Sequence, residues 1–129
     1  MEAFVLINCL FVGCGGFIGS VLRYLCSFIK VDIWGFPFVT LGINIVGSFT
    51  ILFFAGIFAK TLPVDEHIML FLRVGLCGGF TTFSTFSAET LAMLEAGDTL
   101  LAIAYATASC VFCVFAAFLG EIASSAIVV

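Results

Sequence analysis

The sequence predicts an all-α membrane protein: four transmembrane helices with a broken third helix, assembled as an antiparallel dual-topology homodimer. Of its 129 residues, 64% are hydrophobic and only 9% are charged, and the mean hydropathy of +1.36 lies far above that of soluble domains. Long uncharged runs predict a single four-helix transmembrane domain over residues 1–129, with helices at about 3–29, 38–59, 68–95 and 99–122. A run rich in glycine and hydroxyl residues at 74–87 interrupts the third helix.

Charge and cysteine content limit the classes of partner. The net charge of −4 and an isoelectric point near 4.5 argue against nucleic-acid binding, because the chain has little positive charge to neutralise phosphates. The six cysteines lie singly within apolar runs, without the close pairing of a zinc site. We therefore expect them to be buried free thiols.

The first predicted helix begins with the uncharged run 3–22, whose twenty residues span about 30 Å as a helix and cross the hydrocarbon layer. It has no basic leader, so we expect it to be retained rather than cleaved. Small residues at 15, 16, 19 and 20 have the spacing that lets a second helix approach closely. Arg23 follows them, deep enough that its guanidinium needs a partner or must reach the interface.

Two of the predicted helices carry a polar stripe on one face. A short loop at 30–37, with an interfacial tryptophan and a proline that favours helix initiation, precedes the second helix. In both stripes the polar or polarisable residues recur at i, i+4 and i+8. The stripes consist of Thr40, Asn44 and Ser48 in the second helix, and of Tyr105, Ser109 and Cys113 in the fourth. Each stripe predicts either a polar pathway or hydrogen bonds between helices.

The third predicted helix is too interrupted for a simple crossing. It follows a loop at 60–67, in which we expect His67 to be solvated. Arg73 and Glu89 have only fifteen uncharged residues between them, about 22 Å of continuous helix. Glycines at 75, 78 and 79 come soon after Arg73. We therefore predict a break near 78–82, followed by a second half-helix.

The distribution of basic residues predicts the dimer. Four helices put both termini on one side, together with Lys60 and Arg73, and put Arg23 and Lys30 with the other two loops. This tie gives no preferred orientation under the positive-inside rule. We therefore expect opposed subunits, with each pore wall facing the fourth helix of the partner. The alternative is that a tie among so few charges arises by chance.

The run at 74–87 predicts two ion sites. Carbonyls freed by a helix break can face an ion, and those of Gly78 and Thr81, doubled at a dimer axis, would form an oxygen cage. No carboxylate lies nearby, so we expect sodium rather than calcium. Phe83 and Phe86 lie at i and i+3 on one helix face, and their electropositive ring edges can line a route for a small anion. Ordinary core packing is the alternative for this pair.

Other classes of function find less support. The chain has one histidine and no P-loop, GxSxG or HExxH pattern, so we do not expect an enzyme. A proton-coupled multidrug or cation exporter of the four-helix dual-topology type is the main alternative. Such an exporter needs an intramembrane acid, for which Glu89 is the sole candidate. A third possibility is a structural membrane subunit.

Three motifs resemble those of the CrcB/Fluc fluoride channel family. They are the run at 78–86 (GGFTTFSTF), the run at 19–24 (GSVLRY) and the run at 41–49 (LGINIVGSF). The resemblance covers nearly the whole chain. It implies a passive fluoride-selective channel that exports fluoride from the cytoplasm, in the inner membrane of a prokaryote, with two antiparallel pores per homodimer and a structural central sodium ion.

The resemblance also implies roles for individual residues. The carbonyls of Gly78 and Thr81 would hold sodium, and Arg23 would lie at the cytoplasmic vestibule. The residues implied to line the fluoride pore are Asn44, Phe83, Phe86, Thr40, Ser84, Tyr105 and Ser109. Cys113 departs from the pattern, because a weakly donating thiol stands where we expect a hydroxyl.

Overall fold

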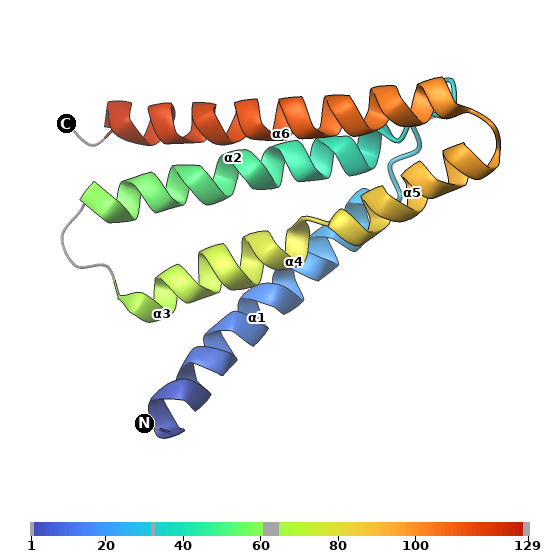
Figure 1. Ribbon diagram of the computed structural model, residues 1–129. Coiled ribbons are helices and arrows are strands. Elements are labelled where there is room, and N and C mark those ends of the chain that lie inside the picture. Colours follow the sequence, from blue (N-terminus) through green and yellow to red (C-terminus); the bar gives the residue numbers. More distant parts are fainter. Residues whose placement is uncertain (1, 32, 61–64, 128–129) are drawn as a thin grey trace.

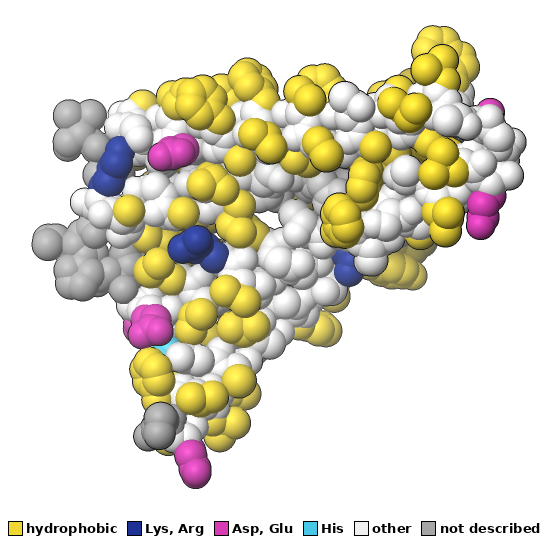
Figure 2. All heavy atoms as spheres, in the orientation of Figure 1, with side chains coloured by type: hydrophobic (Ala, Val, Ile, Leu, Met, Phe, Trp, Pro, Cys, Tyr) yellow, Lys and Arg dark blue, Asp and Glu magenta, His cyan; other side chains and the backbone are white. Residues whose placement is uncertain are grey.

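A computed structural model describes residues 2–31, 33–60 and 65–127, so residue 32 of the first predicted loop and residues 61–64 of the second lie outside the described residues. The described chain contains four spans that are long and apolar enough to cross a membrane: Glu2–Cys26, Phe38–Lys60, Glu66–Glu95 and Thr99–Ile127. The prediction of a multi-pass, all-helical membrane protein is confirmed. Figure 2 shows hydrophobic side chains over the visible face and acidic side chains toward its ends.

Three of the spans are continuous helices. They are α1 (Glu2–Cys26), α2 (Phe38–Lys60) and α6 (Thr99–Ile127). The first ends before residue 29, where Ser27, Phe28 and Ile29 form turns on the preceding carbonyls. The last continues beyond residue 122, because no glycine or proline follows to stop it and the buried Ser124 packs against α2 at Gly56.

The third span contains several short segments: α3 (Glu66–Met69), the π-helical η1 (Leu70–Cys77), α4 (Gly78–Phe80) and α5 (Phe83–Glu95). Between α4 and α5 the backbone is extended, with φ −73° and ψ 158° at Thr81 and φ −149° and ψ 110° at Thr82. Helical backbone therefore ends at Phe80 and resumes at Phe83. Non-helical backbone at this depth needs polar partners from elsewhere in the protein.

The helices pack in two pairs. The first helix, α1, lies against η1 and α4, while α2 runs along α6, as Figure 1 shows. A Cβ at Gly15 would overlap the carbonyl oxygen of Phe71, and one at Gly19 would overlap that of Leu76. The predicted close packing at these small residues is therefore confirmed, and it holds α1 beside the extended segment.

His67 corrects one prediction. Its ring is half-buried rather than solvated, and it stacks on Phe11 with centroids 4.9 Å apart. Its Nδ1 lies 2.8 Å from Oδ1 of Asn8, and its backbone N–H donates to the Asp65 carboxylate that caps α3. Contacts with α1 thus withdraw this side chain from water.

Candidate functional site

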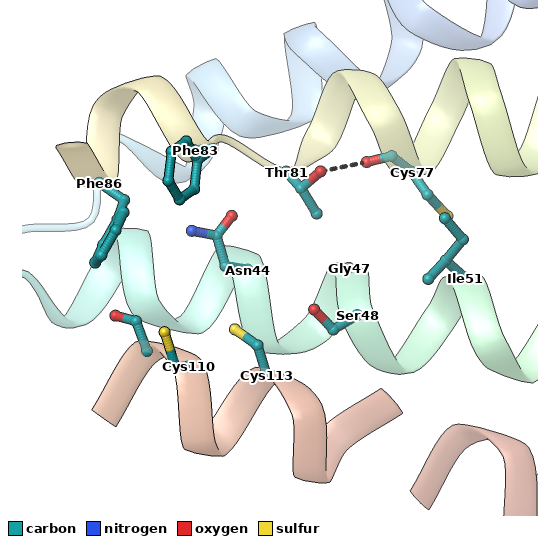
Figure 3. Close-up of a pocket in the computed structure, with 11 residues that line it drawn as sticks. Asn44, Gly47, Ser48, Ile51, Cys77, Thr81, Phe83, Phe86, Cys110 and Cys113 are labelled. Carbon is teal, nitrogen blue, oxygen red and sulfur yellow. Dashed lines mark hydrogen bonds between the residues drawn. The ribbon is translucent and has the colours of Figure 1, made fainter. Parts of the chain in front are cut away.

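The polar stripes of α2 and α6 face a common cavity of about 370 Å³. Asn44 and Ser48 line it from α2, while Ser109 and Cys113 line it from α6, and Figure 3 shows the cavity walls. The residues that line this cavity all come from one chain, and the expectation that the partner's fourth helix faces the pore wall stays a prediction. Helices α2 and α6 meet along their length, which brings the stripes together without a second copy.

Asn44 holds the extended backbone at the start of α5. Its Oδ1 accepts the backbone N–H of Thr82 at 2.8 Å, and its Nδ2 donates to the Thr82 carbonyl at 3.1 Å. These two bonds fix the orientation of the amide, because only Oδ1 can accept the N–H. The second N–H of Nδ2 remains for another acceptor, and Asn44 lines the cavity.

Thr82 starts α5 with its side chain. Its Oγ1 accepts the backbone N–H of Thr85 at 3.1 Å, as an N-cap does. The same hydroxyl is 2.9 Å from Oγ1 of Thr85 and 3.3 Å from Oγ of Ser84. Thr82 is buried, so the extended backbone is held by one side chain of α2 and by its own cap.

Phe83 and Phe86 lie together at the cavity, as their spacing predicts. Their ring centroids are 5.4 Å apart with an interplanar angle of 43°, and both rings line the cavity (Figure 3). Phe86 also contacts Tyr105, with centroids 5.2 Å apart. Phe83, by contrast, is 79% exposed in the single chain. One ring is therefore fixed by packing, whereas the other has an open side.

Glu89 accepts hydrogen bonds from two of the predicted pore residues. The hydroxyl of Thr40 donates to Oε1 at 2.7 Å, and that of Tyr105 donates to Oε2 at 2.7 Å. Thr40 and Tyr105 are buried, Tyr105 completely, and Glu89 is half-buried. The carboxylate thus joins α2, α5 and α6, and the protons of both hydroxyls point to it rather than into the cavity.

A second cavity, of about 340 Å³, lies on the other side of this carboxylate. Glu89, Trp34, Met93 and Asp98 are among its lining residues, so it reaches the loops before α2 and before α6. Phe86, which contacts Tyr105, lines the first cavity. The cluster of Thr40, Glu89 and Tyr105 therefore lies between the two cavities.

The hydroxyl of Ser109 has no hydrogen-bond partner in the described part of the chain. Ser109 is buried and lines the first cavity. Within residues 2–31, 33–60 and 65–127 no hydrogen bond satisfies its Oγ, although the Tyr105 hydroxyl lies close by. A buried hydroxyl without a partner is costly. An acceptor entering the cavity would supply the missing bond.

The carbonyls at the break are used unequally. Cys77 O accepts from both the backbone N–H and the hydroxyl of Thr81, and Gly79 O accepts from Nε of Arg23 at 3.2 Å. No hydrogen bond in the described part of the chain reaches the carbonyls of Gly78 or Thr81, the two predicted sodium ligands. Arg23 therefore lies against the break, and its role at a vestibule stays a prediction.

Other site residues differ from expectation. Ser84 is exposed and contacts Thr82 rather than lining the cavity. Cys110, which has no role in the predictions, lines the cavity beside Cys113. All six cysteines are free thiols as predicted, but Cys9, Cys14 and Cys110 are exposed in the single chain rather than buried. The C-x-x-C spacing of 110 and 113 was the available signal for a thiol pair, and the carboxyl group of Glu89 was the signal for the cluster.

Comparison with known proteins gives consistent matches. The family model described as CrcB-like protein, Camphor Resistance (CrcB), matches residues 10–121. A protein of Ruminiclostridium cellulolyticum named fluoride-specific ion channel FluC is 39% identical over 124 residues, 95% of each chain. Proteins of the same name from Clostridium novyi and Shewanella halifaxensis are 48% and 41% identical, over 74% and 88% of this chain and 77% and 93% of theirs. The chain belongs to the CrcB family.

Proposed function

We propose that this chain is a passive fluoride-selective channel that exports fluoride from the cytoplasm. Relatives alike over most of their length are named fluoride-specific ion channels, and membership of this family means that the chain is not an enzyme. The observation that carries the proposal is the cavity that Asn44 and Ser109 share with two phenylalanine rings, in which the Ser109 hydroxyl has no hydrogen bond among the described residues.

The cavity offers donors suited to a small, strongly hydrated anion. The Ser109 hydroxyl and the second N–H of Asn44 would replace water around fluoride, while the edges of the rings of Phe83 and Phe86 add weak positive potential. None of these groups carries a full positive charge. Fluoride would therefore be desolvated without being held too tightly to leave.

Between the two cavities, fluoride would meet the carboxylate of Glu89. Like charges repel strongly in a low-dielectric site, so passage requires donors that change partners. The hydroxyls of Thr40 and Tyr105 are such donors, because each can rotate from a carboxylate oxygen to the ion. In this mechanism Glu89 orients two hydroxyls for the anion, while its negative charge raises the barrier for anions of higher charge.

We propose that two such chains form an antiparallel dual-topology homodimer with two pores, in the inner membrane of a prokaryote. The exposed ring of Phe83 and the unpaired carbonyls of Gly78 and Thr81 support a second copy at the break. In the proposed dimer the third span is a broken helix. Two carbonyls per chain, doubled, suit a sodium ion, which would supply positive charge to hold the two breaks together.

The dimer has its own test at Gly78. In the single chain a Cβ at this position would meet only Arg73 O, at 3.9 Å, so Gly78→Ala would be tolerated by an isolated subunit. If a second copy approaches the break, the same change should weaken dimerisation, measured by crosslinking in liposomes of decreasing protein density. Equal dimerisation of Gly78→Ala and of Gly13→Ala, whose Cβ meets no atom within 4 Å, would contradict an interface here.

Purified protein in liposomes tests the function. Vesicles loaded with potassium fluoride should release fluoride rapidly once a potassium ionophore is added, and should retain chloride when loaded with potassium chloride. A proton-coupled exporter is the second candidate, which the position of Glu89 between two cavities also favours. Such an exporter would instead move a cationic substrate when a pH gradient is applied, without the ionophore. Absence of ionophore-dependent fluoride release would refute the channel.

A further inference from the structure

Two thiols share the wall of the proposed pathway. Cys110 and Cys113 both line the first cavity from α6, and Figure 3 shows their sulfur atoms directed into the space that Asn44 and Phe86 face. Cys113 also lies near the hydroxyl of Ser48 and near Cys110. The cavity therefore contains a pair of soft ligands rather than one isolated thiol.

The spacing of the pair suits a metal ion held by two sulfurs. Residues at i and i+3 of a helix have Cβ atoms about 5–6 Å apart. Metal–thiolate bonds of about 2.3 Å, as in zinc sites, put two sulfurs at opposite sides of a metal about 4.6 Å apart. Rotation about the two Cα–Cβ bonds is enough to adjust the sulfur positions. A linear, two-coordinate metal therefore fits without movement of the helix.

The residues around the two thiols determine which charge and which coordination number of a metal ion are favoured. Among the described residues, no group of three or more histidine, cysteine and acidic side chains is placed to hold a metal ion, so the pair has no third protein ligand. Two thiolates around a divalent ion are neutral, whereas two thiolates around a monovalent ion leave a negative charge. An apolar cavity disfavours that uncompensated charge. Soft divalent ions that accept two-sulfur coordination are therefore favoured.

We propose that Cys110 and Cys113 form a binding site for a thiophilic divalent metal ion, with mercury(II) as the probe, and that the bound ion blocks the proposed fluoride path. On binding, each thiol loses its proton to water as its sulfur–metal bond forms, and the ion loses its two chloride ligands. No oxidation is involved. The binding site does not depend on the proposed function, whereas the block rests on it.

The binding test uses a full-length chain in which Cys9, Cys14 and Cys26 are replaced by serine, which leaves Cys77, Cys110 and Cys113. The protein receives one equivalent of mercuric chloride and an approximately tenfold excess of glutathione, and retained mercury is measured after gel filtration. The pair should keep most of the metal, because the second bond is intramolecular. Cys110→Ala and Cys113→Ala should each retain at least about fivefold less mercury.

Cys77 supplies the matched control. It lines the same cavity but comes from η1, and Figure 3 draws it beside Ile51, away from the pair. Cys77→Ala should keep mercury as its parent does. Loss of mercury in Cys77→Ala but not in Cys113→Ala would overturn the assignment, and so would a parent that retains none. Only variants that elute as a single folded species are compared.

The flux test separates binding from block. Fluoride release is measured with and without one equivalent of mercury, and the ratio is compared between the parent and Cys113→Ala. A fall of at least tenfold in the parent alone supports the block. Mercury retention with unchanged release overturns the block. Mercury retention in a protein that releases no fluoride without mercury refutes the channel but leaves the metal site standing.

Discussion

The hydroxyl of Tyr105 donates a hydrogen bond of 2.7 Å to Oε2 of Glu89, and Tyr105 has no solvent exposure. The other carboxylate oxygen accepts from Thr40. Three helices thus meet at one side chain that separates two cavities. Removal of either donor is expected to affect both stability and ion passage.

Tyr105→Phe tests this bond while it keeps the aromatic ring. The change leaves a half-buried carboxylate oxygen without its donor, so we expect a loss of about 1–3 kcal/mol in the free energy of unfolding. Fluoride release should fall about tenfold, because the anion would lose one of its donors at the barrier. Urea or detergent unfolding and liposome flux measure the two effects. Tyr24→Phe is the control, since Tyr24 is 63% exposed; equal effects of the two changes would contradict the role of Tyr105.

Replacement of Asn44 by alanine is expected to destabilise the protein more than replacement of Ser48, its neighbour in the α2 stripe. Asn44→Ala removes the two hydrogen bonds to the Thr82 backbone and should lower the free energy of unfolding by about 2–4 kcal/mol and abolish fluoride release. Asn44→Asp keeps an acceptor for the Thr82 N–H and should retain part of the stability. Ser48→Ala, in the same cavity, serves as the control in unfolding measurements. If Asn44→Ala unfolds like Ser48→Ala, Asn44 does not hold the break.

Helix packing at α1 has a matched pair of tests. Gly19→Ala places a methyl group against the backbone of Leu76, whereas Gly13→Ala meets no atom within 4 Å. We expect overpacking to lower the free energy of unfolding of Gly19→Ala by about 1–3 kcal/mol. Most of this variant should then aggregate. Gly13→Ala should elute and unfold like the parent. Size-exclusion chromatography in detergent distinguishes the two, and a well-folded Gly19→Ala protein would show that α1 can move away.

Substitutions of Phe83 and Phe86 distinguish a role in packing from a role in conduction. Phe83→Ile and Phe86→Ile should each reduce fluoride release at least tenfold while the dimer survives, because an aliphatic side chain has no electropositive edge. Phe86→Ile should also destabilise the fold by about 1–2 kcal/mol, since it loses its contact with Tyr105. Phe118→Ile, exposed on α6, controls for the loss of an aromatic ring. Release at the parental rate in both Phe83→Ile and Phe86→Ile would exclude the rings from the path.

Much of the fold follows from patterns that the sequence displays directly. Uncharged runs gave the four spans, and helical spacing placed Asn44 and Ser48 on one face of the second helix and Ser109 and Cys113 on one face of the fourth. The partner of each polar group did not follow, because helical spacing defines a face but not the rotation of that face against its neighbour. Thus the hydrogen bond of Arg23 to Gly79 O did not follow from the sequence, and His67 was expected in water but stacks on Phe11.

Glu89 shows the same limit at the candidate site. Its carboxyl group was visible in the sequence as the sole intramembrane acid of the third span. Its two hydroxyl partners come from α2 and α6 and are separated from it by 49 and 16 residues. No local rule connects positions so far apart, so only the packed helices show that Thr40 and Tyr105 share one acceptor.

The carbonyls of Gly78 and Thr81, which no described residue bonds, make the stability of the protein depend on what lies beside it in the membrane. Lipid tails offer no hydrogen-bond donors, and each such carbonyl facing them costs several kcal/mol. A lone chain whose two carbonyls face lipid would carry a penalty that the proposed second copy or the proposed sodium ion would relieve. By mass action, dilution with lipid should destabilise the fold itself, so the protein would be most durable where it is most abundant.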